Sequence, residues 1–340
     1  MNITLKEIAE KTNVSISTVS RILNGPDRNL DDEKSRNVIA VAKELGYFKK
    51  KAFTLSYASR KKLSLGCIFT SEHESFLSPF FSDILSGIKE EMGTNTPLYD
   101  LSFTTFNLSD KECLDRLADP QVDGAIILGR TTEANIRFMK AHLPHLVYAG
   151  LNRIGGTDEV ICDAKAGVKS LVSYLITLGH FDIGFIGATR QSSTVFNEYR
   201  YEGFVEALKE GNMTLHPEYV EECFLSASEG YQAANRMILA GKLPTAIICG
   251  NDNVAIGVEK ALADQGIRVP SDVSVTGFDD IADAAFLKPS LTTIAVPRRD
   301  LGRYAVKVLL DSLTTVRDYK ISVQLPFHLE MRESTAKRKG

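Results

Sequence analysis

The hydrophobic pattern of this chain changes once, near residue 63, and this change constrains the fold more than any other feature. The first 46 residues place apolar side chains three and four positions apart, as amphipathic helices do, and carry no strand signal. From residue 63 onward, short apolar runs alternate with amphipathic segments of helix length. The sequence therefore predicts a small all-α head followed by a large α/β body, and 340 residues suit two domains.

Three short helices are expected in the head. Thr4 and Glu7 have the spacing of a capping box, and Ser15 can cap a second helix. Asp31 and Gly46 can begin and end the third. The inward faces of the three helices would carry Leu5, Ile8, Ala9, Val19, Ile22, Leu23, Val38, Val41, Ala42 and Leu45. Two helices joined by a short turn and braced by a third form the helix-turn-helix pattern.

The charge of the chain is unevenly distributed. Residues 1–62 hold 13 Lys and Arg against 7 Asp and Glu, whereas residues 63–340 hold 27 against 36. A basic head on an acidic body indicates that the head contacts a polyanion, with ordinary scatter of charge as the alternative. Residues 48–62 form a basic linker without a periodic signal, so any order there has to come from a partner.

The body is expected to be a doubly wound α/β structure. Apolar runs predict buried strands at residues 63–69, 123–129, 144–150, 182–187, 245–250 and 272–278. Amphipathic segments predict helices near residues 80–93, 133–142, 164–179, 198–211, 228–241 and 252–265. This alternation favours parallel sheets, and the length of the body favours two similar lobes over one.

The sequence also excludes three classes of protein: membrane proteins, secreted proteins and disulfide-stabilised proteins. No apolar run approaches the roughly 18 residues of a membrane span, and the first residues lack the apolar core of a secretory signal. A cytoplasmic location is therefore expected. The cysteines form no C-x-x-C pair and are interpreted as reduced core thiols: Cys67, Cys113, Cys162, Cys223 and Cys249.

Motifs of cofactor-dependent and hydrolytic enzymes are missing. The chain lacks the G-x-G-x-x-G, Walker, G-x-S-x-G and H-E-x-x-H patterns, so neither a cofactor nor a catalytic residue is expected. Glu72, His73 and Glu74 come nearest to a metal site, but neighbours on an extended segment point to opposite faces, and no metal is expected. His180 is interpreted as structural, and the carboxylates of the turn at 277–280 are not placed for glycoside chemistry.

The second helix of the head carries candidate DNA-binding groups. Ser15 and the unpaired backbone N–H groups at the start of this helix can bind a phosphate. Ser17 and Arg21 are four residues apart on the outward face, so both can reach base edges or the backbone from a major groove. Ile16 stays open, because its spacing from Val19 also fits the core stripe.

Several blocks of sequence occur in a familiar order along nearly the whole chain. The head contributes KEIAEKTNVSISTVSRILNG and AKELGY. The body contributes SPFFSDILSGI, VDGAIIL, CDAKAGVKSLVSYLITLGHFDIGFIG, YRYEGFVEAL, PTAIICGNDNVAIGVEKALADQGIRVPSDVSVTGFDD, LTTIAVPRRDLG and MREST. Together these blocks resemble the lactose-repressor and galactose-repressor family of bacterial transcription regulators.

The resemblance implies roles for residues of the head. Ile16 and Ser17 match the family's two base-reading positions, and Ile16 would contact an apolar edge such as a thymine methyl. Arg21 matches a shared DNA contact. Four further residues match positions that lie near the DNA phosphates in the family, namely Thr4, Ser15, Thr18 and Asn24. Leu55 matches a linker leucine that wedges into the minor groove, although AFTLSYA departs here from the usual A-R-S-L spelling.

The resemblance also implies a periplasmic-binding-protein-like body, with an effector cleft between two lobes joined by three crossings. The domain bounds are then 1–47 for the helix-turn-helix head, 48–62 for the hinge linker and 63–340 for the body. Within the body, lobe 1 would take about 63–161 and 292–320, and lobe 2 about 162–291 and 321–335.

Effector-binding residues follow from the same resemblance. Arg200 and Asp279 match cleft positions, where the carboxylate accepts from neighbouring hydroxyls and the guanidinium donates to them. A structural salt bridge between the lobes is the alternative for this pair. Secondary candidates are Asn251 and either Phe80 or Phe81, whose rings offer a flat face to a sugar. Ala149 stands where many relatives carry an acid, which leaves the identity of the ligand open.

The predicted protein is a homodimeric regulator that binds double-stranded operator DNA and represses carbohydrate-utilisation genes. Its predicted effector is a sugar or glycoside, for example a galactose-type sugar. The chain ends without leucine heptads, so a dimer is expected in place of a tetramer. The alternatives are a purine corepressor and activation in place of repression. From other classes, a sugar-transport binding protein would need a signal peptide, and a carbohydrate enzyme would turn over its bound sugar. No membrane partner is expected.

Overall fold

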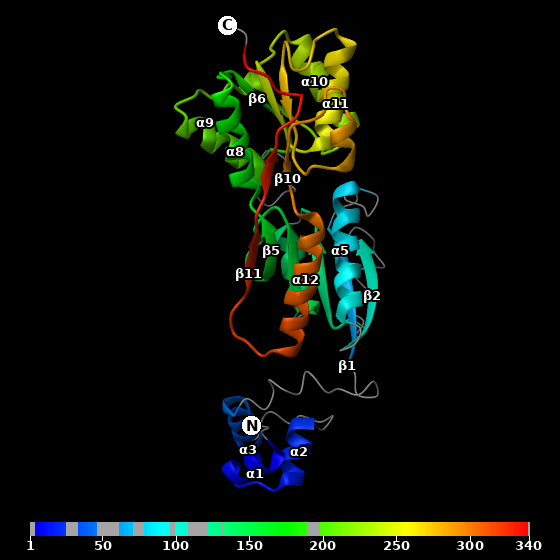
Figure 1. The fold of residues 1–340 in the computed structure, drawn as a ribbon, viewed down its shortest axis with the longest axis vertical. Coiled ribbons are helices and arrows are strands. Elements are labelled where there is room, and N and C mark those ends of the chain that lie inside the picture. Colours follow the sequence, from blue (N-terminus) through cyan, green and yellow to red (C-terminus); the bar gives the residue numbers. More distant parts are fainter. Residues whose placement is uncertain are drawn as a thin grey trace. The chain divides into compact units, whose positions relative to one another are not determined.

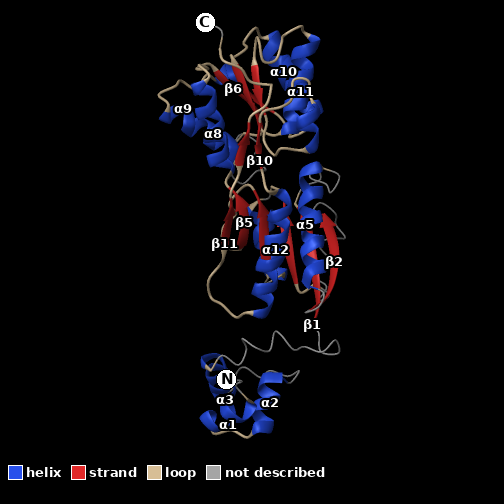
Figure 2. Cartoon of the chain, viewed as in Figure 1, coloured by secondary structure: helices blue, strands red, loops and turns tan. Residues whose placement is uncertain are grey.

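The computed structural model describes residues 4–24, 33–45, 61–70, 78–95, 99–107, 122–130, 132–143, 145–189 and 198–338. The chain divides into two compact units, residues 1–62 with 95–100 and residues 63–94 with 101–340. The described part of the head is helical, and the strands belong to the body (Figures 1 and 2). In the described part of the chain, no helix is both long and apolar enough to cross a membrane.

The head contains the three predicted helices, α1 (Leu5–Thr12), α2 (Ile16–Asn24) and α3 (Glu33–Glu44). The capping box is present, because Thr4 Oγ1 accepts the Glu7 N–H at 3.4 Å and the Glu7 carboxylate accepts the Thr4 N–H at 2.6 Å. Ser15 Oγ accepts the N–H of Thr18 at 3.2 Å. A small apolar core holds the helices together and consists of buried Ile8, Ala9, Val19, Leu23, Val38 and Ala42. Asp31 and Gly46 lie outside the described residues.

The first lobe of the body is built on a six-stranded sheet in the order β11-β5-β4-β3-β1-β2. Its strands are β1 (Lys61–Phe69), β2 (Tyr99–Asn107), β3 (Gly124–Leu128), β4 (Leu146–Gly150), β5 (Asp158–Cys162) and β11 (Ser322–Leu325). Its helices are α5 (Pro79–Asn95), α7 (Glu133–His142) and α12 (Arg298–Thr314), and α12 packs on β3, β4 and β5. Gly87 of α5 and Gly302 of α12 let these helices approach closely, because a Cβ at either position would overlap the other helix's backbone.

The second lobe is built on a four-stranded parallel sheet in the order β7-β6-β8-β9. The strands are β6 (Ile183–Gly187), β7 (Val220–Glu222), β8 (Ala246–Cys249) and β9 (Ser274–Thr276). The helices α8 (Ala164–Thr177) and α9 (Tyr199–Glu210) cover one face, and α10 (Ala227–Leu239) and α11 (Asp252–Asp264) cover the other (Figure 1). Two short 3-10 helices, η2 (Pro217–Tyr219) and η3 (Ala282–Phe286), complete the lobe.

The chain passes between the lobes three times. It enters the second lobe after β5, returns through β10 (Thr293–Ala295) to α12, and leaves again after β11 toward β12 (His328–Glu330), which pairs antiparallel with β10. The C-terminal segment then joins the second lobe, where the Val275 N–H donates to the Ser334 carbonyl at 2.9 Å.

One of the predicted bounds is wrong. The family resemblance places the segment from residue 321 in the second lobe, but Ser322–Leu325 pair in parallel with β5 and extend the first sheet. The reason is a set of polar contacts at this edge, since Asp158 Oδ1 accepts the Ile321 N–H at 2.8 Å and is also bound by Arg317. The body unit starts at residue 63, and the strand β1 itself begins two residues earlier, at Lys61.

His180 is structural, as the sequence indicates. The imidazole is 3% exposed, its Nδ1 lies 3.0 Å from Thr245 Oγ1, and its Nε2 lies 2.9 Å from the Ala336 carbonyl. Burial lowers the pKa of His180. This side chain therefore fastens the C-terminal segment to the second lobe.

Candidate functional site: an effector cavity and a DNA-reading face

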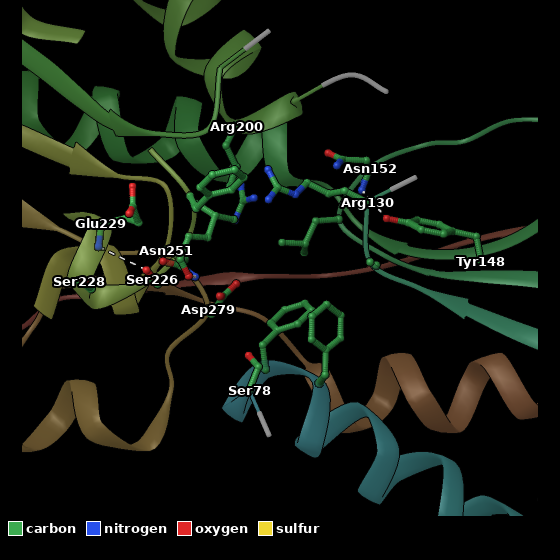
Figure 3. Close-up of a pocket in the computed structure, with 17 residues that line it drawn as sticks. Ser78, Arg130, Tyr148, Asn152, Arg200, Ser226, Ser228, Glu229, Asn251 and Asp279 are labelled. Carbon is green, nitrogen blue, oxygen red and sulfur yellow. Dashed lines mark hydrogen bonds between the residues drawn. The ribbon is translucent and has the colours of Figure 1, made fainter. Parts of the chain in front are cut away.

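A cavity of about 390 Å³ lies where the two lobes of the body meet (Figure 3). It is lined by Ser78, Phe80, Phe81, Gly129, Arg130, Tyr148, Gly150, Leu151, Asn152, Arg200, Phe224, Leu225, Ser226, Ser228, Glu229, Asn251 and Asp279. Most of these residues follow the carboxyl ends of strands, which is the usual ligand position in open parallel sheets. We call this space the effector cavity.

The structure brings together on this lining all five residues that the sequence predicts for effector binding. Phe80 and Phe81 belong to the first turn of α5, and their rings meet edge to face at 5.1 Å between centroids. Phe81 also packs on Phe69 of β1, at 5.8 Å, so it is part of the core as well as the wall. Arg200, Asn251 and Asp279 come from the second lobe and its crossing segment.

Arg200 is buried and already bonded within the protein. Its Nε donates to Glu198 Oε1 at 2.8 Å, and its Nη1 donates to the Gly250 carbonyl at 2.7 Å. Glu198 is 1% exposed, and its other carboxylate oxygen lies 3.6 Å from Nη1 of Arg130. These contacts hold the guanidinium of Arg200 in one orientation at the cavity wall, which is the requirement for directed hydrogen bonding to a ligand.

Asp279 presents a carboxylate oxygen that the protein leaves unpaired. The residue is buried, and Oδ1 has no hydrogen-bond partner. Burial raises the pKa of Asp279 to about 7, against the opposing fields of Arg200 and Arg298. Because an unpaired buried acceptor costs free energy, a donor from a ligand would be stabilised at this position.

The backbone around Asp279 is held in an uncommon conformation. Asp279 and Asp280 have φ of 113° and 55°, in the region that favours glycine. Arg298 donates to the carbonyls of both residues and also lies 2.9 Å from the carboxylate of Asp83 on α5. Arg332 binds the Asp280 carboxylate at 2.6 Å. These arginines keep the Asp279 carboxylate directed at the cavity.

Two helix N-termini contribute polar groups to the wall. Asn251 caps α11, because its Oδ1 accepts the Val254 N–H at 2.9 Å, and its Nδ2 donates to the Leu225 carbonyl at 3.4 Å. Ser226 caps α10 by accepting the Glu229 N–H at 3.3 Å. Asn251 therefore has a structural role in addition to its place on the lining.

Twelve lining residues were not predicted, although the sequence carries a signal for most of them. They stand directly after the apolar runs, as in ILGR at 127–130, AGLN at 149–152 and LSAS at 225–228. The carboxyl ends of parallel strands meet at one edge of a sheet, so these positions could have been proposed together. Ala149 itself is fully buried and does not line the cavity, whereas Tyr148 and Gly150 on either side of it do.

The head presents an exposed face on α2. Ile16 is 48% exposed, which resolves its ambiguity in favour of the outward face, and Ser17 and Arg21 are exposed beside it. The sequence predicts that these three residues contact DNA, and on that ground we call them the DNA-reading face. Ser15 and Thr18 lie at the start of the helix with their hydroxyls 2.8 Å apart. Thr4 caps α1 and is exposed.

Two predicted DNA contacts cannot be placed. The side chain of Asn24, the last residue of α2, and the whole of Leu55 lie outside the described residues. The segment with Glu72, His73 and Glu74 lies outside them as well. Among the residues that are described, no cluster of His, Cys, Asp and Glu could hold a metal ion. The four described cysteines are free and buried, namely Cys67, Cys162, Cys223 and Cys249, and Cys113 is outside the description.

Comparison with known families and proteins agrees with both units. The family model of bacterial regulatory proteins of the lacI type matches residues 4–49, and that of a periplasmic binding protein-like domain matches residues 172–335. The chain is 30% identical over 339 residues to the HTH-type transcriptional repressor PurR of Pasteurella multocida (strain Pm70), covering 98% of this chain and 99% of the relative.

Solved structures show the same architecture. The lac repressor dimer bound to operator and the anti-inducer ONPF has a TM-score of 0.72 at 25% identity, covering 99% of this chain and 100% of that chain. A LacI family transcriptional regulator from Enterococcus faecium with bound ribose has a TM-score of 0.70 at 26% identity, covering 81% of this chain and 100% of that chain.

Proposed function

Because the chain belongs to the lacI family of bacterial regulatory proteins, we propose that it is a homodimeric repressor whose operator affinity is controlled by a sugar-type effector in the body cavity. The observation that carries this proposal is the pairing of two features. One is the exposed DNA-reading face on α2, and the other is the cavity that collects Arg200 and Asp279 with a ring from α5.

The head binds operator DNA through α2 in the major groove. Ile16 and Ser17 contact base edges, and Arg21 contacts a base or a phosphate through its fork of N–H donors. Thr4, Ser15 and Thr18 lie near the phosphates, where helix N-termini attract negative charge. Asn24 and Leu55 complete the set, Leu55 in the minor groove.

A dimer suits this mode of binding, because two heads can occupy the half-sites of a near-palindromic operator. The lac repressor structure that resembles this chain is a dimer on its operator. The domain division proposed for this role is the head at 1–47, the linker at 48–62 and the body from there on, with β11 now counted in the first lobe.

The effector is a sugar or glycoside. Asp279 accepts from ring hydroxyls, Arg200 donates to them, and Phe80 or Phe81 covers the apolar face of the ring, while Asn251 lies at the wall. A ligand that favours one relation between the lobes would change operator affinity by 5- to 150-fold for a coupling of about 1–3 kcal/mol. A purine corepressor is the second candidate, because the phenyl rings of Phe80, Phe81 and Phe224 all line the cavity.

An unbiased selection of duplex oligonucleotides by the purified full-length protein tests the proposal. We expect enrichment of a near-palindromic site and a loss or gain of its binding when the cognate sugar is added. Selection of no sequence, with a panel of sugars and purines both present and absent, would contradict it.

Calorimetric titration with the same panel tests the cavity. Asp279→Asn and Arg200→Ala should abolish binding of whichever compound binds the wild type. If both variants bind the compound as tightly as the wild type, Arg200 and Asp279 are not effector-binding residues. That result would not affect the proposed binding of DNA.

A further inference from the structure

The cationic groups of the effector cavity are two arginines, Arg130 and Arg200, among the lining residues that the structure describes. They come from different lobes, Arg130 after β3 and Arg200 on α9, and Figure 3 shows their guanidinium groups converging. A pair of buried guanidiniums at a ligand site normally favours a phosphate or a carboxylate, because both anions fit the planar fork of N–H donors.

In this chain a buried carboxylate offsets part of the charge of the two arginines. Glu198 lies between them, with one carboxylate oxygen 2.8 Å from Nε of Arg200 and the other 3.6 Å from Nη1 of Arg130. It is 1% exposed and does not itself line the cavity. A carboxylate in this position has little water around it, so its field on both guanidiniums is weakly screened.

The remaining ionisable groups of the wall are acidic. Asp279 is buried with an unpaired Oδ1, and Glu229 lies at the first turn of α10. An anionic ligand would therefore meet two arginines whose charge Glu198 partly offsets, together with Glu229 and the ionised form of Asp279, which repel it. A ligand with hydroxyl groups would meet N–H donors on one side and an open acceptor on the other.

We propose that the effector cavity selects an electrically neutral polyhydroxy ligand against phosphorylated and carboxylated ones, and that Glu198 is the residue that determines this specificity. This inference rests on the proposed function, in which the cavity holds a small effector, and narrows it to uncharged sugars and glycosides. Glu198 acts through the two arginines, so it is a positioning and charge-setting residue and makes no contact with the ligand.

The test is a calorimetric titration of the full-length protein with inorganic phosphate at constant ionic strength, with amide hydrogen exchange over residues 198–204 to locate any binding. The wild type should show no saturable phosphate binding at millimolar concentrations. Glu198→Gln, which keeps the shape and removes the charge, should bind phosphate at least about tenfold more tightly and protect this segment.

Two variants serve as controls. Glu206→Gln removes an equal charge from α9, the helix that Glu198 directly precedes, but Glu206 is about half exposed and pairs with Lys165 at 2.7 Å on the surface. It should behave as the wild type. Glu198→Asp shortens the side chain but retains the carboxylate, so this variant should bind no phosphate either. If only the shape of Glu198 mattered, Glu198→Asp would not restore the wild-type behaviour.

Phosphate binding by the wild type that protects residues 198–204 would overturn the proposal. A folded Glu198→Gln variant that binds phosphate no better than the wild type would remove Glu198 from it. If that variant does not fold, the wild-type titration decides alone, since cavity binding overturns the proposal and its lack supports it. Because no DNA is present, failure of the operator selection would contradict the proposed function without altering these results.

Discussion

The DNA-reading face and the effector cavity hold their candidate binding residues in opposite ways. On the head, Ile16, Ser17 and Arg21 are exposed, and the apolar core beneath them is separate from them. In the body, Arg200 and Asp279 are each 4% exposed and are tied into the fold by ion pairs and backbone contacts.

This difference predicts different consequences of substitution. Exposed groups stay hydrated in the free protein, so changing them alters DNA binding and leaves folding nearly unaffected. Buried charges have lost their water, so removing one member of a pair leaves the other uncompensated and destabilises the fold. The predictions below test this contrast, beginning with the largest expected effect.

Arg200→Ala should lower the free energy of unfolding of the body by about 3–5 kcal/mol, because Glu198 would remain buried without its closest partner. Urea denaturation followed by circular dichroism measures this change. The control is Arg236→Ala, which removes an exposed pair with Glu221 and should cost about 0–1 kcal/mol. If the two variants lower the free energy of unfolding equally, burial does not make the ion pair at the cavity more important for stability than the ion pair on the surface.

Asp279→Asn should change how stability depends on pH between about 4 and 7. The folded state keeps the Asp279 proton up to about pH 7, whereas the unfolded state releases it near pH 4. Raising the pH through this window therefore favours unfolding of the wild type, and the variant loses this dependence. Urea midpoints at several pH values should diverge by the equivalent of a few kcal/mol, and parallel curves would contradict the burial of this carboxyl group.

Ser17→Ala and Ile16→Ala should alter operator preference by about 1–3 kcal/mol per affected base pair, measured by competition between selected and mismatched duplexes. Neither should change the free energy of unfolding of the head by more than about 0.5 kcal/mol. The matched control is Val19→Ala on the buried side of α2, which should cost about 2 kcal/mol of stability. If Ile16→Ala greatly lowers the free energy of unfolding of the head, Ile16 is part of the apolar core and not of the DNA-reading face.

Thr4→Ala should destabilise the head by about 1 kcal/mol through loss of the capping box. Thr4→Ser keeps the hydroxyl and should retain both stability and DNA affinity. Thermal unfolding of the two variants gives the comparison. If Thr4→Ala weakens DNA binding with no change in unfolding, the hydroxyl contributes to phosphate binding and the cap is unimportant.

The fold was predictable where a segment carries its own periodicity. The stripe with Ile8 and Val19 predicted the head, and the apolar runs predicted six strands of the body at close to their observed positions. The short strands β7, β11 and β12 were missed, because three or four residues with partial burial carry little period-two signal, and β10 was missed because its buried run is only three residues long. The helix α12 was also missed, although Leu301, Ala305 and Leu309 give it a helical stripe that sequence alone could have revealed.

The five predicted effector residues lie together on the lining of the effector cavity. The contacts between residues around the rest of the cavity could not be predicted from the sequence. Glu198 illustrates the reason, since nothing in the sequence places it beside Arg130, 68 positions earlier. The same holds for Asp83 and Arg298, which meet at 2.9 Å across 215 positions.

The amino-acid sequence by itself determined the helical head, the alternating body and the family, because each depends on local periodicity or on the order of sequence blocks. Tertiary structure alone decided which strand ends meet, which charges are buried together and which lobe holds Ser322–Leu325. The physical reason is that hydrogen-bond pairing between distant strands and loss of water around buried charges are properties of the assembled fold, and no local stretch of sequence encodes them.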